Sequence, residues 1–246
     1  ADGVNGLTAK ALGLGGDDYG VALEGNARYD ALSRTGYRGR IVLELGIVPG
    51  GYGWVFPKGD HVNVGVGGWK EEAPRLRREL GRFCVAHGLS SDELTETRGY
   101  RLPLRNPGLP IARGRAAVVG DAAGLVDPLT GDGIYEAVGS AQLAADAALA
   151  VLAGEAHGME PYEGAVADAF GKLHGASWKL KQALDRFPRL TFELVRTPLA
   201  WTAIEKVVRG ELRSPSDAGG LARLPLRILD ALGKGAAPTG VAGRTR

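Results

Sequence analysis

The stretch from residue 116 to residue 134 constrains the fold of this chain more than any other part of the sequence. It opens with the apolar residues 116–119, continues through Gly120 and Asp121, and then enters a turn rich in glycine and proline. An alanine-rich segment follows, from residue 133 to about residue 152. This order predicts a strand, a tight turn and a helix, with the Asp121 carboxylate at the start of the helix.

A carboxylate in that position has two compatible roles. It can cap the N-terminus of the helix, as in any strand–turn–helix connection of an α/β protein. It can also accept a hydrogen bond from a sugar hydroxyl of a ligand, because the N-terminus of a helix favours phosphate groups and electron-rich rings. The pattern alone leaves both roles open.

The run Gly-Asp-Ala-Ala-Gly, followed by Pro-Leu-Thr-Gly-Asp-Gly-Ile, closely resembles a fingerprint of known flavoproteins. It is similar to the second FAD-binding motif of the p-hydroxybenzoate hydroxylase-like proteins, in the form typical of their geranylgeranyl reductase branch. In that family Asp121 would hold the ribityl chain, and the helix N-terminus would lie by the pyrimidine side of the isoalloxazine. The residues that the resemblance assigns to FAD here are Gly120, Asp121, Pro128, Gly131, Asp132, Gly133 and Ile134.

A second signature lies in residues 52–67. Tyr52, Trp54 and Phe56 alternate, so we expect them to project from one face of a strand as a broad apolar wall. The segment matches the Tyr-x-Trp-x-Phe-Pro pattern of geranylgeranyl reductases, with Gly-x-Gly seven residues later. The resemblance implies that this wall binds an isoprenoid chain and that the glycines leave room above it. The residues assigned to the substrate are Tyr52, Trp54, Phe56, Pro57, Gly65 and Gly67. The alternative is that the aromatic face only packs the sheet core.

The first residues resemble a third element of the family, an Asp-Gly segment ahead of a helix. It implies that the backbone of Asp2 and Gly3 faces the FAD pyrophosphate. The ADP half of FAD would require a βαβ unit with Gly-x-Gly-x-x-Gly, and the sequence has no such motif. Because the only methionine is Met159, we expect the sequence to be the carboxy-terminal part of a larger enzyme, truncated at its amino terminus.

The pattern of short apolar runs predicts an α/β (α+β) fold with an antiparallel sheet, because several strands follow one another without helices between them. The expected strands are residues 19–25, 40–48, 53–56, 62–67 and 116–120. The expected helices are residues 74–87 and 133–152 and a proline-interrupted region beyond residue 155, and residues 99–115 are expected to form an irregular connector.

These elements suggest a partial, Rossmann-like FAD-binding domain into which a second domain is inserted. The discontinuous FAD-binding domain takes residues 1–18 and 99–155, without its ADP-binding half. The antiparallel substrate-binding sheet takes residues 19–98. Residues 156–246 form a helical region, with a disordered tail from residue 233.

Charge is unevenly distributed. Residues 1–171 hold 16 Lys/Arg against 22 Asp/Glu, whereas residues 172–246 hold 14 against 6. The basic last third favours an anionic partner. No zinc-finger or RNP-like motif supports nucleic acid, so a membrane surface and an ordinary solvated face stay open. The single cysteine and scattered histidines give no disulfide framework and no metal site. We expect a cytoplasmic protein, with peripheral contact at the inner face of the membrane as an option.

The resemblance implies reduction of isoprenoid carbon–carbon double bonds by reduced FAD, with NADPH or another reductant as electron donor. The substrate would be geranylgeranyl diphosphate, geranylgeranylated chlorophyll, an ether lipid or the menaquinone side chain, and the basic last third favours a lipid or a quinone. No residue stands out as the proton donor, so the catalytic residues are not assigned, and the oligomeric state is not predicted. The alternatives are an FAD- and NADPH-dependent aromatic-ring monooxygenase of the same superfamily and an inactive fragment without flavin.

Overall fold

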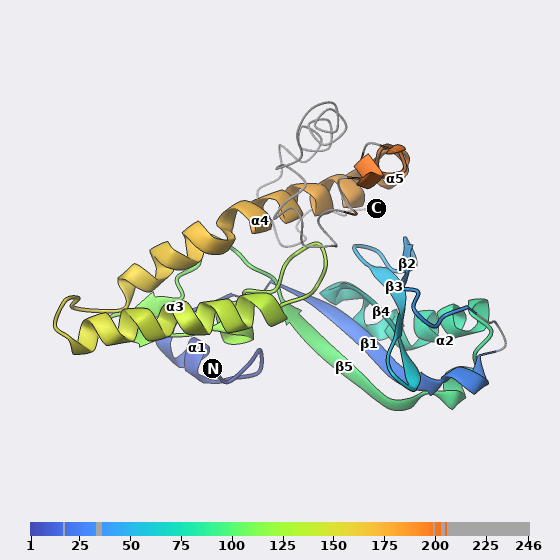
Figure 1. Ribbon diagram of the computed structural model, residues 1–246, viewed down its shortest axis with the longest axis horizontal. Coiled ribbons are helices and arrows are strands. Elements are labelled where there is room, and N and C mark those ends of the chain that lie inside the picture. Colours follow the sequence, from blue (N-terminus) through green and yellow to red (C-terminus); the bar gives the residue numbers. More distant parts are fainter. Residues whose placement is uncertain (17, 33–35, 199, 203–204, 206–246) are drawn as a thin grey trace. The chain divides into compact units, whose positions relative to one another are not determined.

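The computed structural model describes residues 1–16, 18–32, 36–198, 200–202 and 205 (Figure 1). The chain divides into two compact units. Unit 1 consists of residues 1–18 together with the chain from Pro103 onward, and unit 2 is Tyr19–Leu102. The expected boundary at residue 98 falls inside a strand, and the described part of the expected separate region beyond residue 155 belongs to unit 1. The expected tail from residue 233 lies outside the described residues.

Unit 2 is built on a five-stranded sheet with the order β2-β3-β4-β1-β5. The strands are β1 (Tyr19–Arg28), β2 (Val42–Leu45), β3 (Tyr52–Pro57), β4 (His61–Trp69) and β5 (Thr95–Pro103). The pairs β1/β4, β2/β3 and β3/β4 are antiparallel, which confirms the predicted type of sheet. The irregular connector expected from residue 99 is wrong at its start, because β5 continues to Pro103. Most side chains of β5 are exposed and polar, so this edge strand carries no hydrophobic alternation.

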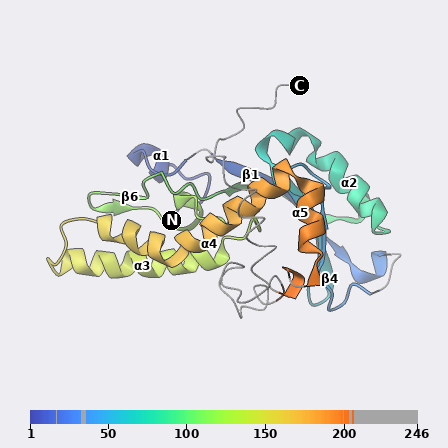
Figure 2. The same ribbon diagram turned by 90° about the horizontal axis from the view of Figure 1, so that it is seen from above.

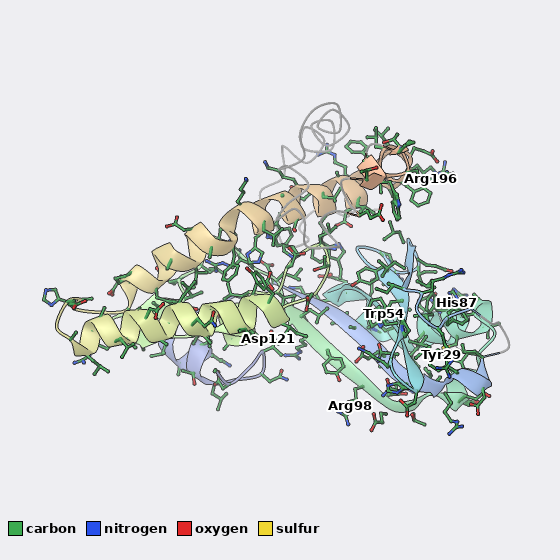
Figure 3. The ribbon with its side chains drawn as sticks, in the orientation of Figure 1. Tyr29, Trp54, His87, Arg98, Asp121 and Arg196 are labelled. Atoms are coloured by element: carbon green, nitrogen blue, oxygen red, sulfur yellow. The ribbon has the colours of Figure 1, made fainter. Side chains whose placement is uncertain are left out.

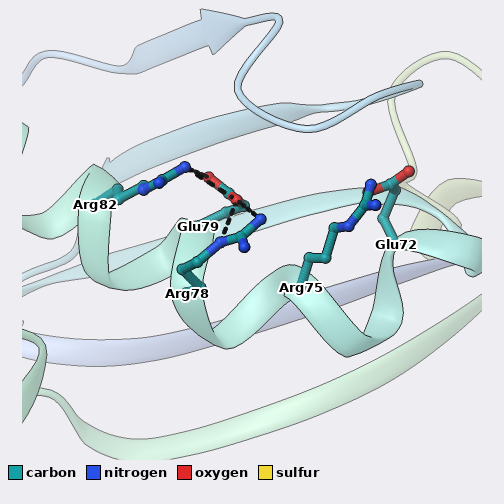
Figure 4. Close-up of polar contacts among 5 residues, drawn as sticks. All are labelled: Glu72, Arg75, Arg78, Glu79 and Arg82. Carbon is teal, nitrogen blue, oxygen red and sulfur yellow. Dashed lines mark hydrogen bonds and ion pairs between the residues drawn. The ribbon is translucent and has the colours of Figure 1, made fainter.

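One face of the sheet forms the core of unit 2. Helix α2 (Leu76–Ala86) packs on it, and the first residues of the predicted helix form a 3-10 turn instead, η2 (Lys70–Arg75). A Cβ at Gly53 would lie 2.7 Å from the Phe83 ring, so the glycine allows α2 to approach the strand. The outer side of α2 carries ion pairs of Glu72 and Glu79 with Arg75, Arg78 and Arg82 (Figure 4). The short turns η1 (Tyr29–Ala31) and η3 (Ser91–Glu93) complete the unit.

Cys84 lies fully buried in this core, and burial raises the pKa of its thiol to about 11. At pH 8 only about 0.1% of such a thiol is the reactive thiolate. We therefore expect native protein to react with a thiol reagent at pH 8 at least a hundredfold more slowly than protein unfolded in urea. Absorbance of the released chromophore measures both rates. A native rate close to the unfolded rate would contradict the burial of Cys84.

Unit 1 contains two long helices that run side by side, α3 (Ile134–Leu152) and α4 (Glu160–Arg186) (Figures 1 and 2). The shorter elements are α1 (Thr8–Leu12), the pair of strands β6 (Ala112–Arg113) and β7 (Ala116–Ala117), the 3-10 turn η4 (Gly120–Ala123), and α5 (Pro188–Val195). The expected strand 116–120 is shorter than predicted, because its partner β6 pairs with it over only two residues, and Gly120 (φ +56°) already begins the next turn.

The start of α4 holds the segment around β6 and β7 in place. The Glu163 carboxylate accepts hydrogen bonds from the backbone N–H groups of Ile111 and Ala112, at 2.5 and 2.9 Å. The Tyr162 hydroxyl donates to the carbonyl of Val118 at 2.9 Å. These bonds fix the segment that leads into Gly120. Among the described residues, no helix is both long and apolar enough to cross a membrane.

Candidate functional site

The turn at Gly120 brings the end of the β7 segment into close contact with α3. The Gly120 N–H donates to the Ser140 hydroxyl at 3.0 Å. A Cβ at residue 120 would lie 3.0 Å from the Cβ of Ala137, tighter than ordinary contact. With its φ of +56°, residue 120 therefore needs to be glycine for two independent reasons.

Asp121 follows at the start of this turn, near the green end of α3 (Figure 3). Its carboxylate is close to Gly133, since a Cβ on Gly133 would lie 3.5 Å from Asp121 Oδ1. Partial burial raises the pKa of the Asp121 carboxyl group above its ordinary value. The structure thus places a partly desolvated carboxylate beside the N-terminus of α3, which begins at Ile134.

The loop between these two points is organised by Asp127, which the sequence analysis did not single out. Its Oδ1 accepts hydrogen bonds from the backbone N–H of Leu129 (3.0 Å) and from the N–H and hydroxyl of Thr130 (2.8 and 3.0 Å). Asp132 then caps α3, because its Oδ1 accepts the Ile134 N–H at 3.2 Å. The Asp-Pro-x-Thr sequence is typical of such a side-chain-closed turn and is the signal that could have identified Asp127.

The sequence analysis assigns the backbone of Asp2 to the FAD pyrophosphate. The side chain of Asp2 has a separate role within the protein. Its Oδ2 accepts the Thr8 N–H at 2.9 Å and so closes the start of α1, and this bond lowers the pKa of Asp2. Gly3 has a φ of +73°. Helix α1 contacts η4, so unit 1 brings the Asp-Gly segment near the Gly120–Asp121 turn.

The aromatic residues of β3 lie together on the face of the sheet opposite α2. The ring centres of Tyr52 and Trp54 are 5.7 Å apart, and those of Trp54 and Phe56 are 6.0 Å apart. Pro57 is paired with Val62. Successive residues of a strand point to opposite faces, so Pro57 does not share the face of the three rings, and its contact with the substrate stays a prediction.

The space above the two glycines is filled rather than open. A Cβ on Gly65 would lie 2.1 Å from Trp54 Cζ2, and one on Gly67 would lie 3.6 Å from Cζ3. The indole therefore lies over β4, and its Nε1 donates to Asn63 Oδ1 at 2.7 Å. The Trp54 ring therefore occupies the room expected above the glycines, and the indole is itself only 7% exposed.

The wall extends onto β2, which the sequence analysis assigned to the sheet but not to the site. Leu43 pairs with Trp54 and Leu45 with Tyr52, so both leucines share the aromatic face. Leu43 is 55% exposed and Leu45 is 44% exposed. The period-two alternation of residues 41, 43 and 45 is the signal that could have identified them.

Because the indole occupies the glycine seat, the substitution Gly65→Ala is expected to destabilise unit 2 by about 1–3 kcal/mol, the usual cost of overpacking. Urea unfolding followed by circular dichroism measures this difference. The matched control is Gly59→Ala in the turn between β3 and β4, where a Cβ meets nothing within 4 Å. The control should be neutral, and equal stability of the two variants would show that Trp54 does not lie over Gly65.

Unit 2 also holds a buried polar cluster that the sequence analysis missed. His87, labelled in Figure 3, lies with its Nδ1 2.8 Å from the Tyr37 hydroxyl and its Nε2 3.0 Å from Glu44 Oε1. His87 directly follows α2, Glu44 belongs to β2, and Tyr37 lies in the chain before β2. Across the described parts of both units, no group of three or more His, Cys, Asp and Glu side chains is arranged to hold a metal ion.

Comparisons with known proteins cover the strands that carry the aromatic wall. The sequence model of the geranylgeranyl reductase catalytic domain matches residues 33–91, which include β2, β3 and β4. The chain is 35% identical to a geranylgeranyl diphosphate reductase of Synechocystis sp. over 154 residues, 61% of this chain and 38% of that protein. It is 31% identical to a digeranylgeranylglycerophospholipid reductase of Thermoplasma acidophilum over 178 residues, 66% of this chain and 45% of that protein.

The crystal structure of a geranylgeranyl bacteriochlorophyll reductase-like protein from Thermoplasma acidophilum matches with a TM-score of 0.73 at 25% identity. The match covers 94% of this chain and 60% of that one. Over the matched stretches the chain is similar to the geranylgeranyl reductases. It spans about two fifths of the length of the curated family members that it matches. The chain has a mixed α/β fold with an antiparallel sheet, as the sequence predicts, and this fold matches that of the reductase-like flavoprotein.

Proposed function

We propose that this chain provides the substrate wall and part of the flavin site of an FAD-dependent oxidoreductase that reduces double bonds in geranylgeranyl chains. The observation that carries the proposal is the wall of Tyr52, Trp54 and Phe56, with the indole seated on Gly65. This wall lies inside the segment matched by the family's catalytic-domain model. The homologues that are named for reduction of geranylgeranyl groups support the same activity.

The residues around Gly120 fit the isoalloxazine and ribityl part of FAD. Asp121 supplies a partly desolvated acceptor for a ribityl hydroxyl, and the first turn of α3 supplies the positive end of a helix dipole. Gly120 and Gly133 stand where a Cβ would meet Ala137 or Val126 at 3.0 Å, so both glycines allow close packing around the proposed site. When bound, reduced FAD would supply hydride to the double bond, and NADPH is the proposed electron donor.

The wall contributes binding without specific polar contacts. Each buried CH₂ of a prenyl chain contributes about 0.8 kcal/mol, so aromatic rings and exposed leucines along one face can hold and orient it. Leu43 and Leu45 extend this apolar surface beyond the three rings. We favour a lipid or a prenylated quinone over the free diphosphate as substrate, because the last third of the chain is basic.

The gene product that contains this chain can be tested for this activity with three prenyl substrates: geranylgeranyl diphosphate, a geranylgeranyl ether lipid and a menaquinone. Incubation with FAD and NADPH in the absence of oxygen should yield prenyl chains that have gained one H₂ for each double bond reduced. Mass spectrometry detects this gain in mass. NADPH oxidation that depends on a phenol and consumes oxygen would instead support an aromatic-ring monooxygenase. Absence of any bound flavin would support an inactive remnant.

An enzyme that acts on a prenyl chain in a membrane needs a surface that binds the membrane. The last described helices carry such a candidate surface. Phe187, Leu190, Phe192 and Trp201 are exposed. Three exposed arginines lie among them: Arg186, Arg189 and Arg196. Lys181, another basic residue of the last third, is buried and cannot face a bilayer. Further basic residues (Lys206, Arg209 and Arg213) and apolar residues (Ile204 and Val208) of the last third lie outside the described residues. We propose peripheral docking at the inner face of the membrane through the exposed set.

Liposome flotation tests this docking. The gene product should float with anionic vesicles at low salt and be released at high salt, because each Lys or Arg near an anionic surface contributes about 1 kcal/mol. Replacing Arg186, Arg189 and Arg196 with Ser should weaken binding at least tenfold. The matched control is replacement of Arg75, Arg78 and Arg82 with Ser, three exposed arginines at the end of η2 and on α2. Equal loss in both triple variants would mean that net charge, and not this surface, drives binding.

A further inference from the structure

Two ionisable side chains meet in the interior of unit 1 and take no part in the proposed chemistry. Glu136 on α3 is 3% exposed, and His174 on α4 is 1% exposed. Their Oε1 and Nε2 atoms are 3.4 Å apart. Burial of such a pair costs desolvation energy, which apolar side chains of similar volume would avoid. The position therefore calls for a role that apolar residues would not fill.

Aromatic rings surround the pair at the contact between α3 and α4. Phe170, one turn before His174, stacks with its ring at a centre-to-centre distance of 6.1 Å. A Cβ on Gly139 would lie 2.7 Å from Phe170 Cζ, so the phenyl ring packs directly on the backbone of α3. Tyr135 meets the same ring edge-on at 5.8 Å. With these rings around the pair, the Glu136 carboxylate is weakly screened, so its electrostatic effect reaches further than it would at the surface.

Glu136 lies in the first turn of α3, the turn that the proposed function sets against the flavin. A helix N-terminus acts as roughly half a positive charge and favours the anionic reduced flavin. A buried carboxylate in that turn opposes this effect, and its contact with His174 Nε2 offsets the carboxylate. Acids near the start of α3 are Asp121 on η4, Asp127 in the preceding loop and Asp132, which accepts the Ile134 N–H. Lys181, buried on α4, interacts with Asp127 and Asp185.

We propose that Glu136 and His174 form an electrostatic positioning pair, which sets how strongly the first turn of α3 favours reduced over oxidised flavin. The proposal rests on the proposed function, since it presumes flavin at this turn. Neither side chain is assigned contact with the flavin or the substrate, and both act through the helix. Because the carboxylate opposes the helix dipole and its imidazole partner offsets the carboxylate, removing one or the other changes the flavin equilibrium in opposite directions.

The test measures the reduction potential of bound FAD in the complete gene product. Glu136→Gln is expected to raise the ratio of reduced to oxidised flavin affinity about tenfold, and His174→Gln to lower it about tenfold. For a two-electron couple, a tenfold change is about 30 mV. The double variant, whose amides can still hydrogen-bond each other, should return close to the original potential. Asp146→Asn, an exposed acid further along α3, is the matched control and should shift nothing.

A purely structural pair would move both single variants in the same direction, or neither, and either result overturns the proposal. Circular dichroism confirms that each variant is folded. If a single variant fails to fold, the double variant and the remaining single variant still decide, since only an electrostatic pair gives a shift that the second substitution reverses. Unmodified protein without bound flavin would overturn the proposed function, whereas bound flavin with unchanged potentials would overturn this proposal alone.

Discussion

Asp121→Ala is expected to weaken flavin binding to the complete gene product by about 1.5–3 kcal/mol, which is roughly a 10- to 150-fold rise in the dissociation constant. The carboxylate lies beside the N-terminus of α3 and accepts a ribityl hydroxyl in the proposed site. Fluorescence titration with FAD measures the constant. Unchanged affinity would remove Asp121 from the cofactor site.

The same residue gives a pH-dependent control in the protein without flavin. Burial raises the pKa of Asp121 in the folded state, so the folded protein loses stability as pH rises through that pKa. Asp121→Asn carries no such charge. The stability of the original protein relative to Asp121→Asn should therefore fall as pH rises from the acid range to neutrality. The opposite trend in urea unfolding would mean that the carboxylate is stabilised by a partner rather than desolvated.

Trp54→Ala is expected to destabilise unit 2 by about 3–5 kcal/mol, because it removes a large buried ring and leaves the backbone at Gly65 uncovered. It should also abolish saturable binding of a prenyl ligand. Trp54→Phe keeps most of the ring but loses the hydrogen bond to Asn63, so its cost should be near 1 kcal/mol. Urea unfolding of both variants measures the difference. A cost below 1 kcal/mol for Trp54→Ala would contradict the packing of the indole on β4.

Local patterns were sufficient to predict the elements with strong periodicity. The alternation in residues 52–57 and the glycine-bounded apolar runs beside them predict β3 and β4, and the alanine-rich run predicts α3 to within a residue of its start. Strand β5 escaped prediction because its polar side chains face solvent on both sides. The short β7 was overestimated, because no rule of alternation reveals where its pairing with β6 ends or that Gly120 begins the next turn.

The candidate site could likewise be predicted only in part from the sequence. The composition of the motifs indicates which residues gather at the start of α3, but not how their side chains are used. Asp127 and Asp132 are engaged in shaping the loop and capping the helix. The pattern of glycines opposite an aromatic residue is compatible with an open channel or with a seat for the ring. Only the register of β3 against β4 distinguishes these two arrangements, and it favours the seat.

The most direct test of the central claim is a single turnover in the absence of oxygen. The gene product is loaded with FAD, reduced chemically, and mixed with a geranylgeranyl lipid while the visible flavin absorption is recorded. We expect the oxidised spectrum to return at a rate that saturates with lipid concentration, together with a lipid that has gained one H₂ for each flavin reoxidised. Flavin that stays reduced with the lipid and is reoxidised only by oxygen would contradict the proposed reductase activity.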